Sequence, residues 1–248
     1  MTGRPRSRRF PALTVVATAA AMVATSGCSA RFGVPEPATE QGEEILSLWR
    51  VLFWAAVGVG GVVVALLAWS LVRYRARGRT DLPVQTKGNF RLEVVYTAIP
   101  LAVAGALFAL SVKTEADTSG REERADVVVD VTGFQWQWRF TYPALGVSVL
   151  GVPGDLPELV LPVGRVTRLR LRSPDVVHSF YVPGFLNKRD AVPGDLTNEM
   201  TVHPVRRGVY GGHCAEFCGF DHARMNFRVR VVDDDEFARW VAAQRRVG

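Results

Sequence analysis

The chain has 248 residues, with 30 Lys and Arg against 24 Asp and Glu, and a formal net charge of +6 at pH 7. This length is enough for one or two domains. From residue 125 onward there are 15 basic and 14 acidic side chains, and no basic stripe with interleaved aromatic residues occurs there. The composition therefore argues against a nucleic-acid-binding protein.

Residues 1–28 have the pattern of a secretory leader. An arginine-rich start is followed by a mostly apolar, alanine-rich run over residues 10–25, which is typical of a signal peptide. The sequence Thr25-Ser26-Gly27-Cys28 resembles a bacterial lipobox, although Thr25 stands where leucine is usual. We predict a signal peptide over 1–28, either a lipoprotein leader modified at Cys28 or an ordinary cleaved one, and an outer linker over 29–45.

Two apolar runs predict a transmembrane hairpin over residues 46–113. The run from Val51 to Val72 has 22 residues without a charge. As a helix it would extend ~33 Å, enough for a hydrocarbon core of ~30 Å. The run from Val94 to Val112 has 19 residues and contains Pro100, which membrane helices tolerate better than soluble ones. Two buried helices of a soluble core are the alternative, which the length of the first run disfavours.

The charges that flank these runs predict the topology. The connecting segment is rich in basic residues, namely Arg73, Arg75, Arg77, Arg79, Lys87 and Arg91, whereas the segment before the first run is rich in glutamate. Positive residues stay on the cytoplasmic side of a membrane. We therefore expect a two-pass plasma-membrane protein in which everything after Lys113 lies on the extracytoplasmic side.

The remainder of the chain has the pattern of a β domain. Eight short runs are strand candidates: Asp126–Val131, Phe134–Phe140, Glu158–Leu161, Arg165–Arg172, Val176–Val182, Glu199–Val202, Gly208–Gly211 and Asn226–Val232. Strict alternation within Arg168–Arg172 and Phe227–Val231 indicates sheets with one buried face. Many short strands in this length favour a Greek-key sandwich or barrel. We predict a membrane-anchored α+β protein in which an all-β domain follows the hairpin.

A short helix is predicted to close the chain. Asp233 would cap its N-terminus, and Phe237, Trp240 and Val241 would share one face.

One short segment, CAEFCGFDHARM, concentrates metal-binding side chains. It contains Cys214, Cys218, His222 and Met225, and His178 lies 36 residues upstream of the first cysteine. Outside the cytoplasm two cysteines usually form a disulfide, and Cys2His2 would also suit structural zinc, but zinc would not need the methionine. Thiolate, imidazole and a weak thioether together favour copper.

The number of thiolates favours two copper ions. A mononuclear blue-copper site uses one cysteine and two histidines, whereas two thiolates can bridge two metals and leave one histidine for each. Met225 could complete one copper and a backbone carbonyl of the loop the other. No ligand position would then be open, which suits electron transfer rather than substrate chemistry.

The motif Cys-x-Glu-x-Cys-x3-His-x2-Met behind a two-helix hairpin resembles subunit 2 of the haem–copper cytochrome c oxidases, over about residues 45–245. The resemblance implies a cupredoxin domain over 125–248 with the binuclear copper centre called CuA. It implies copper ligation by the side chains of His178, Cys214, Cys218, His222 and Met225. It also implies ligation by the carbonyl of Glu216, whose carboxylate would reach a magnesium ion shared with subunit 1.

Two further segments are similar to the family. In Gly133–Trp138, Trp136 matches the residue that receives electrons from cytochrome c, and Trp138 is expected in the core. Glu93 matches a carboxylate at the cytoplasmic mouth of a proton path, although Tyr96 stands where the family usually has tryptophan. A favourable charge at a helix N-terminus is the alternative for Glu93.

The resemblance implies an electron-transfer subunit that passes electrons from a c-type cytochrome to haem in subunit 1, coupled to oxygen reduction and proton translocation. Subunits 1 and 3 and membrane lipid are the expected partners. Asp175 matches an acidic docking residue, but the near-neutral domain favours a membrane-tethered donor, for which tethering replaces steering. Quinol oxidase subunit 2, which lacks the copper ligands, and a membrane-anchored copper chaperone are the alternatives.

Overall fold

The computed structural model describes residues 33–75, 78, 82, 84–119, 124–152 and 154–247. The predicted signal peptide, including Cys28, lies outside this part of the chain. Its cleavage and lipidation therefore stay predictions.

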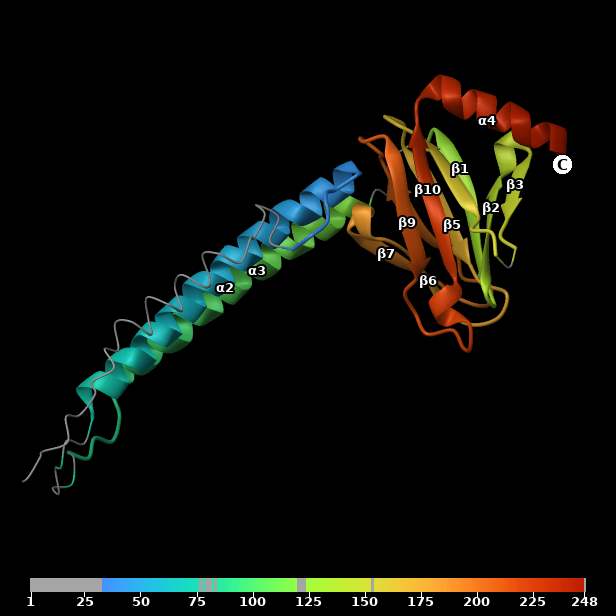
Figure 1. Ribbon diagram of the computed structural model, residues 1–248. Helices are drawn as coiled ribbons and strands as arrows, with labels where there is room; N and C mark the ends of the chain where they lie inside the picture. Colours follow the sequence, from blue (N-terminus) through green and yellow to red (C-terminus); the bar gives the residue numbers. More distant parts are fainter. Residues whose placement is uncertain are drawn as a thin grey trace, which may run out of the picture. The chain divides into compact units, whose positions relative to one another are not determined.

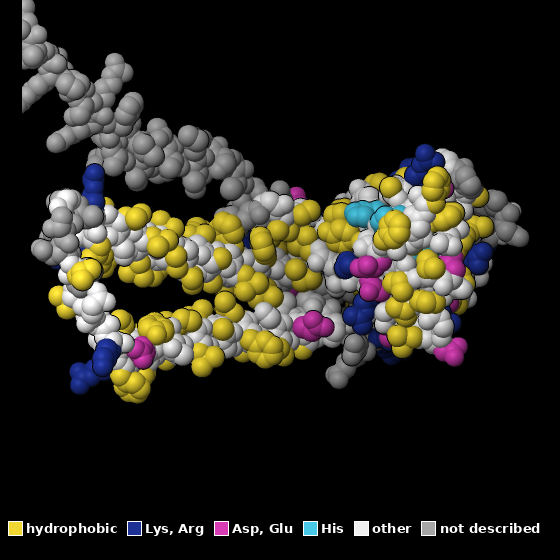
Figure 2. Space-filling model, turned by 90° about the horizontal axis from the view of Figure 1, so that it is seen from below, with side chains coloured by type: hydrophobic (Ala, Val, Ile, Leu, Met, Phe, Trp, Pro, Cys, Tyr) yellow, Lys and Arg dark blue, Asp and Glu magenta, His cyan; other side chains and the backbone are white. Residues whose placement is uncertain are grey.

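Two long helices form the apolar part of the chain, α2 (Glu40–Arg73) and α3 (Phe90–Ser119). Both are long and apolar enough to cross a membrane, and the most apolar stretch of each is not buried within the chain. Figure 2 shows hydrophobic side chains along the length of both helices. These exposed side chains need lipid or other apolar cover, so the helices fit a two-pass membrane protein.

The first helix begins earlier than expected. Residues 40–45, predicted to belong to a linker, are helical. Thr39 caps the helix, because its Oγ1 accepts a hydrogen bond from the amide of Gly42 at 3.1 Å, and Glu40 and Glu43 place negative charge at the positive end of the helix dipole. The residues just before the cap are not a free linker either: Ala38 bonds through its backbone to Gly184 at 2.7 Å.

The second helix ends later than expected. It continues past Val112 to Ser119 through a polar segment. A salt bridge between Lys113 and Asp117, one helical turn apart, spans that segment, and such pairs support exposed helices. The apolar run therefore ends several residues before the helix does.

The rest of the chain is a sandwich of two five-stranded sheets, ordered β3-β2-β1-β5-β8 and β4-β10-β9-β6-β7, which face each other in Figure 1. The strands are β1 (Val127–Phe134), β2 (Gln137–Tyr142), β3 (Val147–Leu150), β4 (Glu158–Pro162), β5 (Thr167–Arg172), β6 (His178–Val182), β7 (Asn187–Ala191), β8 (Asn198–Val202), β9 (Gly208–Cys214) and β10 (Asn226–Val232). The expected Greek-key sandwich behind two helices is confirmed, since β4 and β5, neighbours in sequence, lie in different sheets.

The core lies between the sheets and is aromatic. Phe180 stacks on Phe227 with ring centroids 4.7 Å apart, and Trp138 meets Phe227 edge-on at 5.4 Å. All three side chains are buried. Phe180 and Phe227 belong to one sheet and Trp138 to the other, so these ring contacts join the two sheets and stabilise the sandwich beyond the burial of their area.

Two strands were not predicted and one prediction was wrong. β3 and β7 are edge strands, and β7 reads Asn-Lys-Arg-Asp-Ala, which has the charge that exposed edges use against aggregation rather than apolar alternation. The expected strand Phe134–Phe140 is two strands, because the chain reverses at Gln135-Trp136 between β1 and β2. No glycine, proline or asparagine marks that reversal.

The predicted closing helix is confirmed as α4 (Asp234–Val247). Asp233 Oδ1 accepts a hydrogen bond from the amide of Glu236 at 2.8 Å. Phe237 and Val241 are buried, and Trp240 packs against Tyr142 with ring centroids 5.2 Å apart.

Candidate metal centre

The candidate metal ligands meet where two neighbouring strands and one loop come together. His178 begins β6 and Cys214 ends β9, and these strands pair antiparallel. The loop 215–225 then returns to the same place, because the amide of Cys214 bonds to the carbonyl of Met225 at 3.0 Å. The sheet therefore holds both ends of the loop.

The side chains form a continuous cluster. The sulfur atoms of Cys214 and Cys218 are 3.9 Å apart, about twice the length of a disulfide bond, so the two cysteines are not joined. Nδ1 of His178 lies 3.9 Å from the sulfur of Cys214, and Nδ1 of His222 lies 3.5 Å from the sulfur of Cys218. The sulfur of Met225 is 3.8 Å from that of Cys218. Five soft or borderline donors thus face one small volume.

This volume is shielded from water. His178, Met225 and both cysteines are buried. Trp138 covers the imidazole of His178 edge-on, with ring centroids 6.2 Å apart. Gly133 makes room for this imidazole, since a Cβ there would lie 3.1 Å from Cβ of His178. The side of the site formed by His178, Met225 and the two cysteines is therefore packed and shielded from water, whereas His222 is partly exposed.

The protein alone stabilises one thiolate here, not two. Burial opposes ionisation of Cys214, but hydrogen bonds from His178 and from the backbone lower the pKa of its thiol to about 6. Burial and the neighbouring Cys214 thiolate both raise the pKa of Cys218, to about 12. A second thiolate therefore needs added positive charge between the sulfurs. The donor set of thiolate, imidazole and thioether fits copper ions in that position.

Asp175 orients the histidine of β6. Its Oδ1 lies 2.9 Å from Nε2 of His178, which leaves Nδ1 turned toward the sulfur. Burial lowers the pKa of His178, but the contacts with Cys214 and Asp175 outweigh it and raise that pKa. Burial likewise opposes ionisation of Asp175, yet hydrogen bonds from the amide of Gln135, from His178 and from the amide of Val176 lower its pKa to about 2. Metal-binding histidines commonly have such a carboxylate partner.

This contact of Asp175 was not foreseen from the sequence. The family resemblance suggests a docking role for this residue and not a contact with His178. Its position three residues before a ligand-type histidine was the available signal.

Glu216 contributes two different groups. Its carbonyl oxygen lies 3.3 Å from the sulfur of Cys214, close to the cluster as expected. Its carboxylate points elsewhere and pairs with Nζ of Lys188 at 2.8 Å. Both side chains of that pair are about half exposed.

The two tryptophans of the Gly133–Trp138 segment have different environments. Trp136 is partly buried, and its indole N–H donates to the carbonyl of Cys218 at 3.1 Å. Trp138 is fully buried, as predicted, and its indole nitrogen lies 3.4 Å from the carbonyl of Met225. Trp136 therefore lies between the cysteine loop and the surface.

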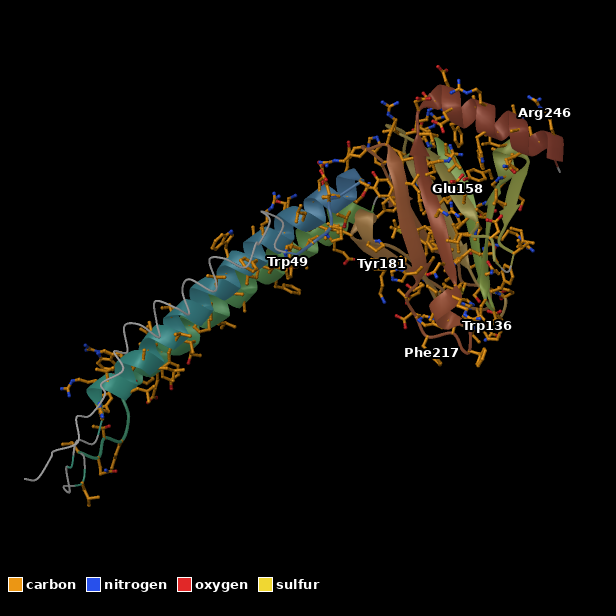
Figure 3. All side chains as sticks on the ribbon, in the orientation of Figure 1. Trp49, Trp136, Glu158, Tyr181, Phe217 and Arg246 are labelled. Carbon is orange, nitrogen blue, oxygen red and sulfur yellow. The ribbon has the colours of Figure 1, made fainter. Side chains whose placement is uncertain are left out.

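The surface beside the cluster is apolar. Phe217 and Phe220 are 82% and 92% exposed. Figure 3 shows Phe217 and Trp136 at the same end of the sandwich. Exposed aromatic side chains in a loop are typical of a contact surface.

Glu93 is not part of this cluster. It lies in the first turn of α3, where its Oε1 accepts a hydrogen bond from the amide of Asn89 at 3.3 Å. The contact resembles that of a helix-capping residue.

Two apolar helices followed by a β-sandwich, with a buried cluster of thiolates, imidazoles and a thioether, define a membrane-anchored protein of the cupredoxin-like, electron-transferring class. The family described as cytochrome C oxidase subunit II, periplasmic domain, matches residues 155–232. The probable cytochrome c oxidase subunit 2 of Streptomyces avermitilis is 36% identical over 95% of this chain and 88% of its own length. The cytochrome c oxidase subunit 2 of Mycobacterium tuberculosis is 31% identical over 99% and 84%.

Among solved structures, the periplasmic domain of subunit II of cytochrome oxidase from Bradyrhizobium japonicum is similar. It has 38% identity, covers 50% of this chain and 96% of that chain, and has a TM-score of 0.46. The chain belongs to the cytochrome c oxidase subunit 2 family. It is the electron-transfer component of a haem–copper oxidase, and the resemblance seen in the sequence is confirmed.

Proposed function

We propose that the cluster holds a binuclear copper centre through which electrons pass toward haem in the catalytic subunit 1. The thiolates of Cys214 and Cys218 would hold the two ions, together with Nδ1 of His178 and Nδ1 of His222. Met225 and the carbonyl oxygen of Glu216 would complete the two sites. When bound, the copper pair accepts one electron and gives it up again.

This proposal rests on the order of the donor atoms across the site, which is nitrogen, sulfur, sulfur, nitrogen. Each sulfur has its own imidazole nitrogen, at 3.9 Å for Cys214 with His178 and 3.5 Å for Cys218 with His222. A mononuclear copper site would use one thiolate with both histidines. The paired arrangement is better suited to two metals than to one.

Copper stoichiometry with electron paramagnetic resonance tests the proposal. We expect two copper ions per chain that share one unpaired electron. One copper per chain, or zinc in place of copper, would contradict it.

The protein's part in the reaction is to keep the donors in place and dry. Because the ligands come from β6, the end of β9 and a loop tied to both, a change of metal charge would move them little. The buried aromatic side chains around His178 exclude water, so the surroundings need little rearrangement when one electron arrives.

We propose that Trp136 receives electrons from the donor. Its indole N–H bonds directly to the carbonyl of Cys218 at 3.1 Å, which gives a short covalent and hydrogen-bonded route from the surface to a sulfur. The donor would be a c-type cytochrome, soluble or membrane-tethered. Subunits 1 and 3 are the proposed partners in the plasma membrane.

Two ionic roles extend the proposal. The carboxylate of Glu216 would hold magnesium shared with subunit 1, which requires Lys188 to release it and subunit 1 to supply the remaining ligands. Glu93, at the start of α3, would lie at the cytoplasmic mouth of a proton path. Magnesium analysis of the assembled oxidase, and proton-uptake rates of a Glu93→Gln variant, test these roles.

A further inference from the structure

Five loops of the sandwich lie at the same end as the metal cluster, which we call the cluster end. The register of the two sheets makes β1, β3, β5, β7 and β9 end there and β2, β4, β6, β8 and β10 begin there. The loops at the cluster end are therefore 135–136, 151–157, 173–177, 192–197 and 215–225.

The exposed apolar side chains of the β domain gather at the cluster end. Within the described residues after 125, nine large hydrophobic side chains are exposed. Eight of them belong to the cluster end: three in 150–156, two in 176–177, one at 196 and two in 217–220. The ninth is Val209, near the start of β9. Exposed apolar side chains scattered singly are ordinary, whereas their concentration on one face marks an interaction surface.

Phe217 and Phe220 are the most exposed of the eight and lie closest to the metal cluster. The ring of Phe217 meets the imidazole of His222 edge-on, with centroids 5.7 Å apart. Between the two phenylalanines, a Cβ on Gly219 would lie 3.3 Å from the indole of Trp136, so this indole packs against the backbone that joins them. The two exposed rings thus adjoin both a candidate copper ligand and the proposed point of electron entry.

Charge does not give this end a dominant sign. Glu216 pairs with Lys188 at 2.8 Å, and Asp221 lies 3.6 Å from Arg224. The loops of the cluster end and the strand positions beside them hold five carboxylates against four cationic side chains, namely Asp155, Asp175, Asp195, Glu216 and Asp221 against Arg139, Arg172, Lys188 and Arg224. The apolar side chains are therefore what distinguishes this face from the rest of the sandwich.

The membrane anchor joins the sandwich at the opposite end. Gly184 follows the last residue of β6, which begins at the cluster end, and its carbonyl accepts the hydrogen bond from Ala38 just before α2. The chain's own membrane is therefore not what covers the apolar loops. An electron, in contrast, has to reach the metal cluster, and the cluster lies directly beneath these loops.

We propose that Phe217 and Phe220 are the main contacts of an apolar docking surface for the electron donor, and that this donor is a c-type cytochrome with apolar side chains around its exposed haem edge. The inference rests on the proposed function, in which Trp136 receives the electron. The haem iron of the donor is oxidised by one electron and the copper pair is reduced by one, so the haem edge has to approach this face. Burying exposed aromatic rings against an apolar rim supplies the affinity.

The experiment follows reduction of the full-length, copper-loaded protein in detergent by a reduced soluble c-type cytochrome with an apolar, weakly charged face around its haem edge. Stopped flow gives the second-order rate constant at low and at high ionic strength. The double variant Phe217→Ser, Phe220→Ser should lose at least about tenfold of this rate constant. The loss should remain at high ionic strength, because salt screens charges and not apolar contacts.

Three comparisons separate apolar contact from other causes. Phe217→Leu with Phe220→Leu keeps the surface apolar and should keep most of the rate. Val209→Ser removes an exposed apolar side chain at the opposite end and should leave the rate unchanged. A second cytochrome of equal reduction potential, with lysines around its haem edge, should react more slowly at high ionic strength.

Four outcomes would overturn the inference. They are a serine double variant as fast as wild type, a loss that disappears at high ionic strength, an equal loss in the leucine and serine variants, and a faster reaction of the lysine-rich cytochrome at high ionic strength. Sedimentation tests a second copy of the chain as the occupant: wild type and serine variant should sediment alike, and a dimer found only in wild type would also overturn the inference.

The copper signal is recorded before mixing, together with its reduction by a small uncharged reductant, which should be equally fast in wild type and the serine variant. A chain without the shared-electron signal refutes both the proposed function and this inference. An intact signal with an unchanged cytochrome rate in the serine variant refutes the docking inference alone.

Discussion

The carboxylate of Asp175 holds the imidazole of His178, with Oδ1 2.9 Å from Nε2. The other carboxylate oxygen accepts a hydrogen bond from the amide of Gln135 at 2.7 Å, next to Trp136. One side chain therefore connects the candidate copper ligand with the turn that carries the proposed electron-accepting residue. Its four hydrogen-bond donors, including the hydroxyl of Ser173, leave it little freedom to move.

Replacing Asp175 by asparagine should weaken copper binding. The neutral amide removes the charge that orients His178, and loss of such a partner typically costs 10–100-fold, so we expect roughly that range. Competition against a copper chelator measures the affinity. Asp195→Asn, at an exposed position in the connection between β7 and β8, is the matched control. Equal affinity of Asp175→Asn and wild type would show that the contact does not support the metal.

Replacing Met225 by leucine should shift the reduction potential upward while the fold is kept. The side chain is fully buried, and a swap of similar volume costs less than about 1.5 kcal/mol. Loss of the thioether donor destabilises the more positive, oxidised copper more than the reduced form. Voltammetry of the copper-loaded protein measures the shift.

The control for the methionine is on β8. Met200→Leu removes another buried thioether that is not part of the cluster, and it should leave the potential where it was. A potential that moves equally in both variants would exclude ligation by Met225.

Replacing Trp136 by phenylalanine should slow reduction by a cytochrome without removing copper. The variant loses the hydrogen bond to the carbonyl of Cys218, and we expect roughly a tenfold slower rate, equivalent to ~1.4 kcal/mol in barrier. Stopped-flow reduction gives the rate. Trp138→Phe should instead lower the free energy of unfolding by about 0.5–3 kcal/mol and change the reduction rate less than Trp136→Phe does. A larger loss of reduction rate in Trp138→Phe than in Trp136→Phe would indicate that electrons enter through the core and not through Trp136.

Adjacent glycines of β9 should respond differently to alanine. A Cβ on Gly212 would lie 2.2 Å from the ring of Phe227, whereas one on Gly211 would meet nothing within 4 Å. Phe227 is buried and stacked on Phe180, so it cannot move aside without loss of packing. Gly212→Ala should cost about 1–3 kcal/mol, and Gly211→Ala should stay within about 0.5 kcal/mol.

Thermal or denaturant unfolding of the two glycine variants measures this difference. Equal stability of both would show that the core around Phe227 adapts more easily than its packing indicates.

The parts of the fold that local chemistry specifies were predicted well. The helices follow from long uncharged runs, and the alternation in Thr167–Arg172 and Asn226–Val232 follows from one buried face. β7 was not predicted, because edge strands carry charge in place of apolar alternation. The reversal at Gln135-Trp136 was not predicted either, because no turn-forming residue marks it. The extension of α3 to Ser119 was not predicted, because an apolar run indicates only the length of the membrane span and the helix continues beyond it.

The identity of the copper-type donors followed from the sequence alone, because Cys214, Cys218, His222 and Met225 are close in the chain and donor softness depends on residue type, not on fold. Only the tertiary structure decided how those donors pair and what surrounds them. His178 reaches Cys214 because β6 and β9 are neighbours in one sheet, and Asp175 meets the amide of Gln135 from a segment 40 positions away. Both relationships join residues more than 30 positions apart, and such distances are set by strand order and register, which no local pattern encodes.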